Sequence, residues 1–111
     1  MPRDYKTYPE DILQAIDKVR RYTTGLSIQA WAEDERTLDA VVRNLEVIGE
    51  AVKQLPDPVR SAHPEVEWKR IAELRDILIH ADFGVDVEIV WSIVRDKLPT
   101  LRTQIEQILH E

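Results

Sequence analysis

The stretch LDAVVRNLEVIGEAVKQL, from Leu38 to Leu55, carries the clearest structural pattern in the chain. Its apolar residues recur every three or four positions, which places them along one face of an α-helix. Gly49 lies beside that stripe, although a glycine inside a helix costs ~1 kcal/mol relative to alanine. We therefore predict a core helix from about Glu35 to Leu55, with another segment approaching closely at Gly49. The stripe comprises Leu38, Val41, Val42, Leu45, Ile48, Val52 and Leu55.

Helical patterns continue on both sides of this segment. A helix is expected from about Pro9 to Thr24, because proline suits the first helical turn and Gly25 supplies a stop. A short helical turn is expected at residues 28–31, and another within the proline-containing connection of residues 55–68. These turns link the main helices without adding a second domain.

The last third of the chain predicts one long helix, from Val87 to about His110. Asp86 can cap its start. Pro99 removes one backbone hydrogen bond and crowds the preceding turn, so a kink is expected near residues 95–98. With only three glycines and no alternating stretch, no strands are expected. The fold class is therefore all-α: one domain over residues 1–111, with four main helices, a short extra helical turn and a kinked last helix.

Composition limits the chemistry. The absence of cysteine excludes disulfides, thiol nucleophiles and thiolate metal sites. No metal-ligand motif or phosphate-binding glycine loop is present, so neither a metal nor a cofactor is expected. The polar N-terminal residues and the lack of an apolar run of ~18 residues favour a cytoplasmic protein without a membrane partner. The net charge of −6 argues against a general nucleic-acid coating protein but not against a local basic cleft. Such a cleft could draw on Arg60, Lys69, Arg70 and Arg75, unless these form an ordinary solvated face.

Arg75 is the unexpected residue of the remaining predicted helix, which begins near Pro64 or Val66 and ends near His80. It falls within ~40° to 60° of the apolar stripe of that helix. A charge that loses water without a partner is costly, so Arg75 requires internal carboxylates, such as Glu46 and Glu50, backbone carbonyls or an anionic ligand. The stripe consists of Ile71, Leu74, Leu78 and Ala81.

His80 follows Arg75 by five positions and projects ~140° away from it on an ideal helix. The two side chains could converge if the helix loosens before Gly84, or if a two-fold partner brings a second pair alongside. Alternatively, His80 only places a favourable charge at the C-terminal end of a helix. An imidazole that transfers protons and an arginine that stabilises a pentacoordinate phosphate would suffice for metal-independent RNA cleavage, because the ribose 2′-hydroxyl is the nucleophile.

Three long segments strengthen this interpretation. Arg75-Asp-Ile-Leu-Ile-His80 matches the Arg-x4-His motif of HEPN (higher eukaryotes and prokaryotes nucleotide-binding) domains. The surrounding sequence resembles the HepT-like (DUF86) branch of that superfamily, from about Tyr8 to Leu109. The segments that carry the resemblance are AVVRNLEVIGEAVKQLP (residues 40–56), HPEVEWKRIAELRDILIHADFGVD (residues 63–86) and EIVWSIVRDKLPTLRTQIEQIL (residues 88–109).

The resemblance implies a helical homodimer with two motifs at a shared cleft. It implies a metal-independent endoribonuclease toxin of a type VII-like toxin–antitoxin pair, with RNA as substrate and a minimal nucleotidyltransferase as antitoxin. On that basis His80 transfers protons, Arg75 stabilises the phosphorane, and Asp76 orients one of the two. The candidates for RNA contact are Lys69, Arg70 and Arg43.

One position departs from the family pattern. HepT toxins commonly extend the motif to Arg-x4-His-x-Tyr, and the nucleotidyltransferase attaches AMP to that tyrosine. Asp82 occupies the position here, with Phe83 next to it, so AMP transfer at this site is in doubt. Asp82 also favours an alternative, a catalytically weak protein that binds a nucleotidyltransferase partner, a nucleotide or both. A third interpretation is a purely structural helical dimer in which Arg75 and His80 satisfy core carboxylates.

Overall fold

The computed structural model describes residues 6–78 and 87–111, apart from the side chains of Arg75 and Ile77. Helices and their connections account for the described residues, and no strand occurs among them, which confirms the all-α prediction. The elements are α1 (Thr7–Thr23), α2 (Ile28–Ala32), α3 (Glu35–Gln54), α4 (Asp57–Ser61), α5 (Trp68–Ala72), α6 (Leu74–Leu78), α7 (Val87–Ser92), the π-helical turn η2 (Ile93–Lys97) and α8 (Leu98–Leu109).

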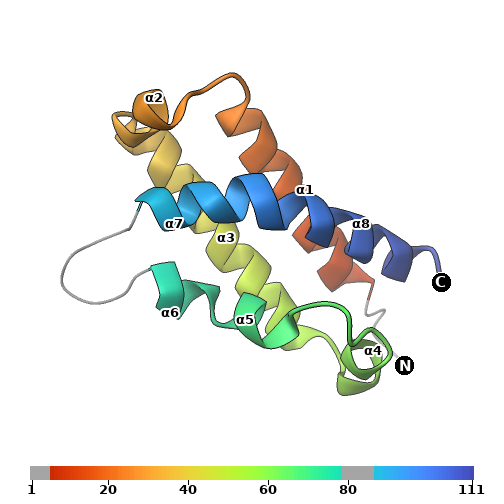
Figure 1. Cartoon of the computed structure of the whole chain (residues 1–111). Coiled ribbons are helices and arrows are strands. Elements are labelled where there is room, and N and C mark those ends of the chain that lie inside the picture. Colours follow the sequence, from red (N-terminus) through yellow and green to blue (C-terminus); the bar gives the residue numbers. More distant parts are fainter. Residues whose placement is uncertain (1–5, 79–86) are drawn as a thin grey trace.

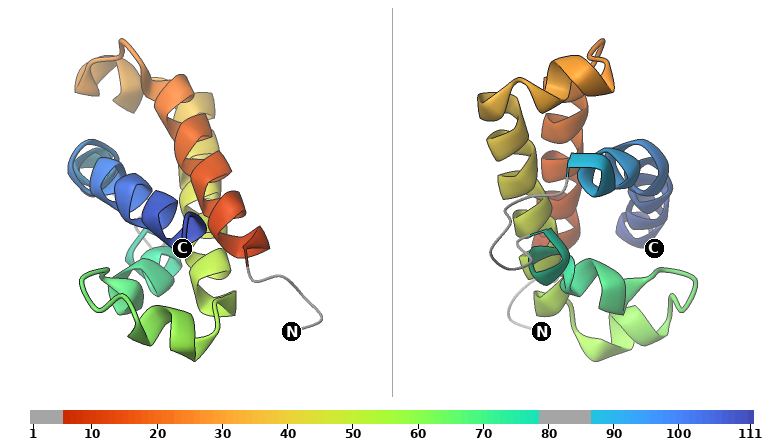
Figure 2. Two further views of the ribbon diagram at one scale, coloured as in Figure 1. Left: turned by 90° about the vertical axis from the view of Figure 1, so that its right-hand side faces the viewer. Right: turned by 60° about the vertical axis from the view of Figure 1, so that its left-hand side comes forward.

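The centre of the bundle is an antiparallel pair, α1 and α3, which α2 joins at one end (Figure 1). The run α7–η2–α8 lies across this pair, so that α7 contacts α2 and α8 contacts α1. The short helices α5 and α6 pack against α3 below that run, as the turned views also show (Figure 2). The two sets of helices thus enclose α3 from different sides.

The core forms where the apolar stripes of these helices meet. Burial of such surface is the main favourable term in folding. The predicted stripe of α3 is buried except for Leu38, which is half-buried. Within the described part of the chain, no helix is both long and apolar enough to cross a membrane. The residues with no exposed surface are, on α1, Ile12, Ile16 and Val19; on α3, Val41, Leu45, Ile48 and Val52; and on the α7–η2–α8 run, Val90, Ile105 and Ile108.

The helix boundaries follow local chemistry. Helix α1 begins two residues before the predicted Pro9 and ends at Thr23, where Gly25 takes a positive φ of 79° and turns the chain. At the start of α3, the Asp34 carboxylate accepts hydrogen bonds from the Thr37 N–H at 3.1 Å and from the Thr37 hydroxyl at 2.7 Å. These bonds lower the pKa of Asp34, because both stabilise its ionised form.

The predicted close approach at Gly49 is confirmed, and it coincides with an unpredicted break. A Cβ atom on Gly49 would lie 3.1 Å from the carbonyl oxygen of Ile71 and 3.7 Å from that of Ala72. The single helix predicted from Pro64 or Val66 to His80 is wrong in this part: α5 starts at Trp68, and α6 follows only after Glu73. The break falls where the end of α5 presses against α3, so a tertiary contact overrides helical continuity. The predicted end of this helix at His80 lies outside the described residues.

The irregularity predicted near residues 95–98 takes the form of a π-helical turn, η2. Pro99 follows it directly in α8, and because η2 and α8 are continuous, its missing N–H removes one helical hydrogen bond at this point. A π turn widens the helix by one residue, which accommodates the proline ring without ending the helix. The predicted cap Asp86 lies outside the described residues.

Replacing Gly49 with valine is expected to lower the free energy of unfolding by about 1–3 kcal/mol, because overpacking forces α5 away from α3. Urea denaturation monitored by circular dichroism measures the change. Ala40→Val, on the same helix but only half-buried, controls for the cost of a β-branched residue. Equal losses in the two variants would show that the contact with α5 contributes nothing.

Helices α1 and α8 are also joined by an ion pair. The Arg102 Nε donates to Asp17 Oδ1 at 2.9 Å, and Arg102 also pairs with Glu106. The hydrogen bond from Arg102 holds the pKa of Asp17 below its ordinary value of 3.8, while the same carboxylate raises the pKa of Arg102. The stabilisation is therefore complete above pH 3.8 and is lost as the pH falls through the lower folded value.

Asp17→Asn is expected to reduce the free energy of unfolding by about 0.5 kcal/mol at neutral pH, since both side chains are partly exposed and solvent screens the pair. The difference from wild type should disappear as the pH approaches ~2. Urea titrations across this range test it, with Asp39→Asn on the exposed face of α3 as control. If the difference in the free energy of unfolding between variant and wild type stayed constant with pH, the ion pair between Asp17 and Arg102 would not be its cause.

Candidate functional site

The helical turn that carries Arg75 is held firmly on the core. Helix α6 places Leu74 and Leu78 at 6% and 1% exposure, and it packs on α3 beside Gly49. The backbone of Arg75 lies between these two buried leucines, whereas its side chain is outside the description. Its predicted pairing with Glu46 and Glu50 therefore stays a prediction. So does its convergence with His80, because His80, Asp82 and Phe83 lie outside the described residues.

Asp76, the residue after the motif arginine, is exposed and faces a hollow of about 580 Å³. We call this the Trp68 hollow. It lies at the junction of four elements, α3, α4, α5 and α6, so residues far apart in sequence meet there. Of the predicted site residues it brings together Asp76 and Lys69. Its lining comprises Lys53, Asp57, Arg60, Ser61, Trp68, Lys69, Ala72, Glu73 and Asp76.

Charges of both signs line the Trp68 hollow in equal number. Arg60 forms an ion pair with Asp57, and its Nε is buried without a hydrogen-bond partner among the described residues. Lys53 lies 3.4 Å from Glu50, an exposed contact that contributes little. Lys69 is exposed and forms no ion pair within the described ranges. The hollow therefore keeps ammonium groups that an incoming anion could engage.

Trp68 is fixed at the edge of this hollow. Its indole Nε1 donates to the carbonyl oxygens of Arg60 at 3.0 Å and His63 at 2.9 Å. The ring is half-buried: one part packs against the core and another lines the hollow. These contacts also explain why α5 starts at Trp68 rather than earlier, since they hold the preceding residues in turns.

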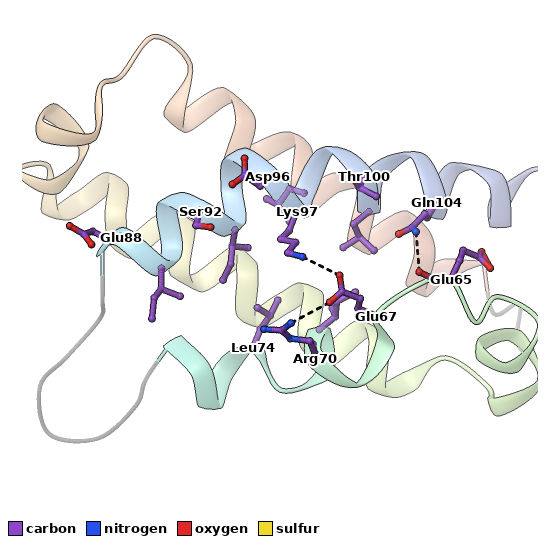
Figure 3. A pocket seen from close by; sticks show the side chains of 15 residues that line it. Glu65, Glu67, Arg70, Leu74, Glu88, Ser92, Asp96, Lys97, Thr100 and Gln104 are labelled. Carbon is purple, nitrogen blue, oxygen red and sulfur yellow. Dashed lines mark hydrogen bonds and ion pairs between the residues drawn. The ribbon is translucent and has the colours of Figure 1, made fainter.

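Arg70 lies in a different hollow, a groove of about 520 Å³ between α5 and the η2–α8 run (Figure 3). Glu67 bridges the groove by accepting from Lys97 at 3.2 Å and pairing with Arg70 at 3.7 Å. The apolar floor includes Leu74 and Leu101. Because Arg70 is turned toward Glu67 here, it does not share a surface with Lys69, its neighbour in sequence.

Arg43, the third candidate for RNA contact, lines yet another hollow, between the start of α1 and the end of α3. Three carboxylates, those of Asp11, Glu46 and Glu50, line it as well. A phosphate placed there would meet more negative than positive charge. The three predicted RNA-contacting residues thus lie in three separate hollows, and only Lys69 is near Asp76.

Sequence reasoning missed Trp68, Lys53 and Ser61 as possible site residues. For Trp68 the sequence did hold a signal, because this aromatic residue directly precedes the basic pair Lys69 and Arg70. Lys53, on α3, gave no signal, because only packing brings it near Asp76.

His63 has a structural role, because it holds the connection before α5 against the end of the chain. Its Nε2 lies 2.9 Å from the Glu111 carboxylate, and its Nδ1 lies 3.4 Å from that of Glu65. The contact joins the connection before α5 to the end of α8. His63 is therefore engaged away from Asp76 and is not a candidate for catalysis.

Comparisons with known proteins identify the family. The family model described as "Ribonuclease HepT-like" matches residues 12–108. A protein of Thermococcus cleftensis named "Probable ribonuclease HepT" is 41% identical over 108 residues, which is 97% of this chain and 98% of that protein. A protein of Methanocaldococcus jannaschii named "Putative RNase MJ0127" is 41% identical over 112 residues, which is 100% of this chain and 93% of that protein. No solved structure matches the chain significantly. The chain belongs to the HepT-like ribonuclease family of the HEPN superfamily.

Proposed function

We propose that this protein is a metal-independent endoribonuclease and acts as the toxin of a pair with a minimal nucleotidyltransferase antitoxin. The observation that carries the proposal is the motif from Arg75 to His80, in a chain that matches the HepT-like family over residues 12–108. The ribonuclease names of its relatives support the same activity class. In the structure, the support is the fixed position of α6, which holds the backbone of Arg75 between two buried leucines.

The proposed chemistry needs only groups that the motif supplies. A neutral His80 imidazole takes the proton of the ribose 2′-hydroxyl while the 2′-oxygen attacks the adjacent phosphorus. As the bond from phosphorus to the 5′-oxygen breaks, a protonated imidazole returns a proton to that oxygen. The products are a 2′,3′-cyclic phosphate and a 5′-hydroxyl. Arg75 stabilises the extra negative charge on the phosphorane through charge-assisted hydrogen bonds.

Base and acid are two imidazoles in this scheme, so we propose a homodimer in which a second copy supplies the other His80. The groove between α5 and α8 supports this arrangement, because it lies directly beside α6 and has an apolar floor. Ile89, at its edge, is 41% exposed. Covering this groove with a second copy would place the two α6 helices close together.

The alternative is a catalytically weak protein that acts by binding its nucleotidyltransferase partner. Two observations favour it: Asp82 stands where the family motif has tyrosine, and the chain is acidic overall. A carboxylate two residues after His80 would repel an RNA phosphate. This alternative keeps the partner but replaces control by AMP transfer with control by complex formation.

His80→Ala and Arg75→Ala are each expected to lower the rate of RNA cleavage by at least ~10²-fold, because proton transfer and phosphorane stabilisation each contribute that much. The assay uses the purified full chain without antitoxin, in EDTA, and size-exclusion chromatography with light scattering determines its mass. Lys18→Ala, an exposed change on α1, serves as control. Wild-type protein that leaves RNA intact would refute the proposal. A loss of a few kcal/mol of stability on Arg75→Ala, without any activity to lose, would support a purely structural role instead.

Asp82→Tyr is expected to restore AMP transfer, because it supplies the phenol that the family modifies at this position. Incubation with the nucleotidyltransferase and ATP, followed by intact-mass spectrometry, should show one added adenylate group on this variant and none on wild type. Phe83→Tyr places a phenol one residue away and serves as the control for position. Adenylation of wild type would contradict the proposed role of position 82.

A further inference from the structure

We propose that the Trp68 hollow binds one nucleotide of single-stranded RNA beside the cleaved phosphodiester, with Trp68 stacking on the base and Lys53 and Lys69 contacting phosphate. The placement beside the cleaved bond rests on the proposed function. The binding itself does not, because it follows from the lining of the hollow.

The position of the hollow fits a neighbouring nucleotide. Asp76 lines it, and Asp76 directly follows Arg75 in the chain. Consecutive Cα atoms lie about 3.8 Å apart, so the backbone of Arg75 lies next to the wall of this hollow. On the proposed function, an RNA strand bound at the motif would therefore pass close to this hollow.

Trp68 supplies a rigid surface for stacking. Its two hydrogen bonds, to the carbonyl oxygens of Arg60 and His63, fix the plane of the ring. Stacking of a base on an aromatic side chain contributes about 1–3 kcal/mol and tolerates any base. A ring already fixed by the fold loses little conformational entropy on binding. The hollow is thus suited to unpaired bases, whereas the paired bases of a duplex are not available for stacking.

The charge balance distinguishes this hollow from the other two. Its cations, Lys53, Arg60 and Lys69, equal its carboxylates in number, and Lys69 has no ion-pair partner in the described part of the chain. The groove beside it carries four carboxylates against two cations, and the hollow around Arg43 carries three against one. The Trp68 hollow is therefore the least repulsive of the three for a phosphate. Its carboxylates are those of Asp57, Glu73 and Asp76.

The test measures binding of a fluorescently labelled single-stranded 2′-O-methyl RNA of mixed sequence, which lacks the free 2′-hydroxyl and cannot be cleaved. Fluorescence anisotropy with the full chain is expected to show about a five- to tenfold rise in Kd for Lys69→Ala and for Lys53→Ala, since each removes one phosphate contact. Lys18→Ala, an equal change of charge on α1, should alter Kd less than about twofold. A duplex of the same sequence should bind more weakly.

Tryptophan fluorescence provides a second measurement. Stacking should quench Trp68, and Trp68→Phe should abolish the quenching, while Trp31 and Trp91 remain as the unchanged background; circular dichroism verifies the fold. Equal Kd values for Lys69→Ala, Lys53→Ala and Lys18→Ala would overturn this inference even if wild type cleaves RNA. Conversely, a loss of binding in Lys53→Ala and Lys69→Ala but not in Lys18→Ala would support nucleotide binding at this hollow. That result would stand even if wild type did not cleave RNA, and then only the proposed function would fail.

Discussion

The arrangement depends on the contact between the backbone of α5 and Gly49 of α3. A Cβ atom on Gly49 would lie only 3.1 Å from the Ile71 carbonyl oxygen, so any larger residue would push the two backbones apart by a few tenths of an ångström. The contact brings α5 and α6 against the central helix, and Leu74 and Leu78 then complete the core. The turn that bears Arg75 is thereby fixed, and so is the wall of the Trp68 hollow.

This dependence explains what the sequence could and could not predict. The helices α1 and α3 follow from regular apolar stripes and their capping residues, and both were predicted to within two residues. The division of the next helix at Glu73 could not be predicted, because nothing in its local sequence weakens helix formation there. The break arises where α5 meets α3, although Gly49 had already indicated a close approach.

The candidate site likewise has one part that the sequence predicted and another part that only the packing of the helices reveals. The Arg75–His80 motif is a sequence pattern, and its role stays a prediction, because His80 and the side chain of Arg75 lie outside the described residues. The predicted cluster of basic residues did not anticipate the structure: Lys69 and Arg70 are adjacent in sequence, yet they face different hollows. Helical geometry separates consecutive side chains by ~100°, so adjacency in sequence is a poor guide to a shared surface. Trp68 and Lys53 join the site only through the packing of α3, α4 and α5.

The π-helical turn also has a consequence for the phase of the last helix. Val90, Val94 and Leu98 follow one another at intervals of four, whereas the later members of the stripe, Leu101, Ile105 and Ile108, alternate intervals of three and four. In a uniform α-helix two successive intervals of four would drift ~80° around the axis. The extra residue held in η2 absorbs that drift, so Val90 and Leu98 are both buried. A deletion of that extra residue would leave these valine and leucine positions seven residues apart, and in a uniform α-helix such positions differ by only ~20° around the axis. The two halves of this helix would then keep their core faces, so the π turn is how the helix holds one residue more than its core pattern needs.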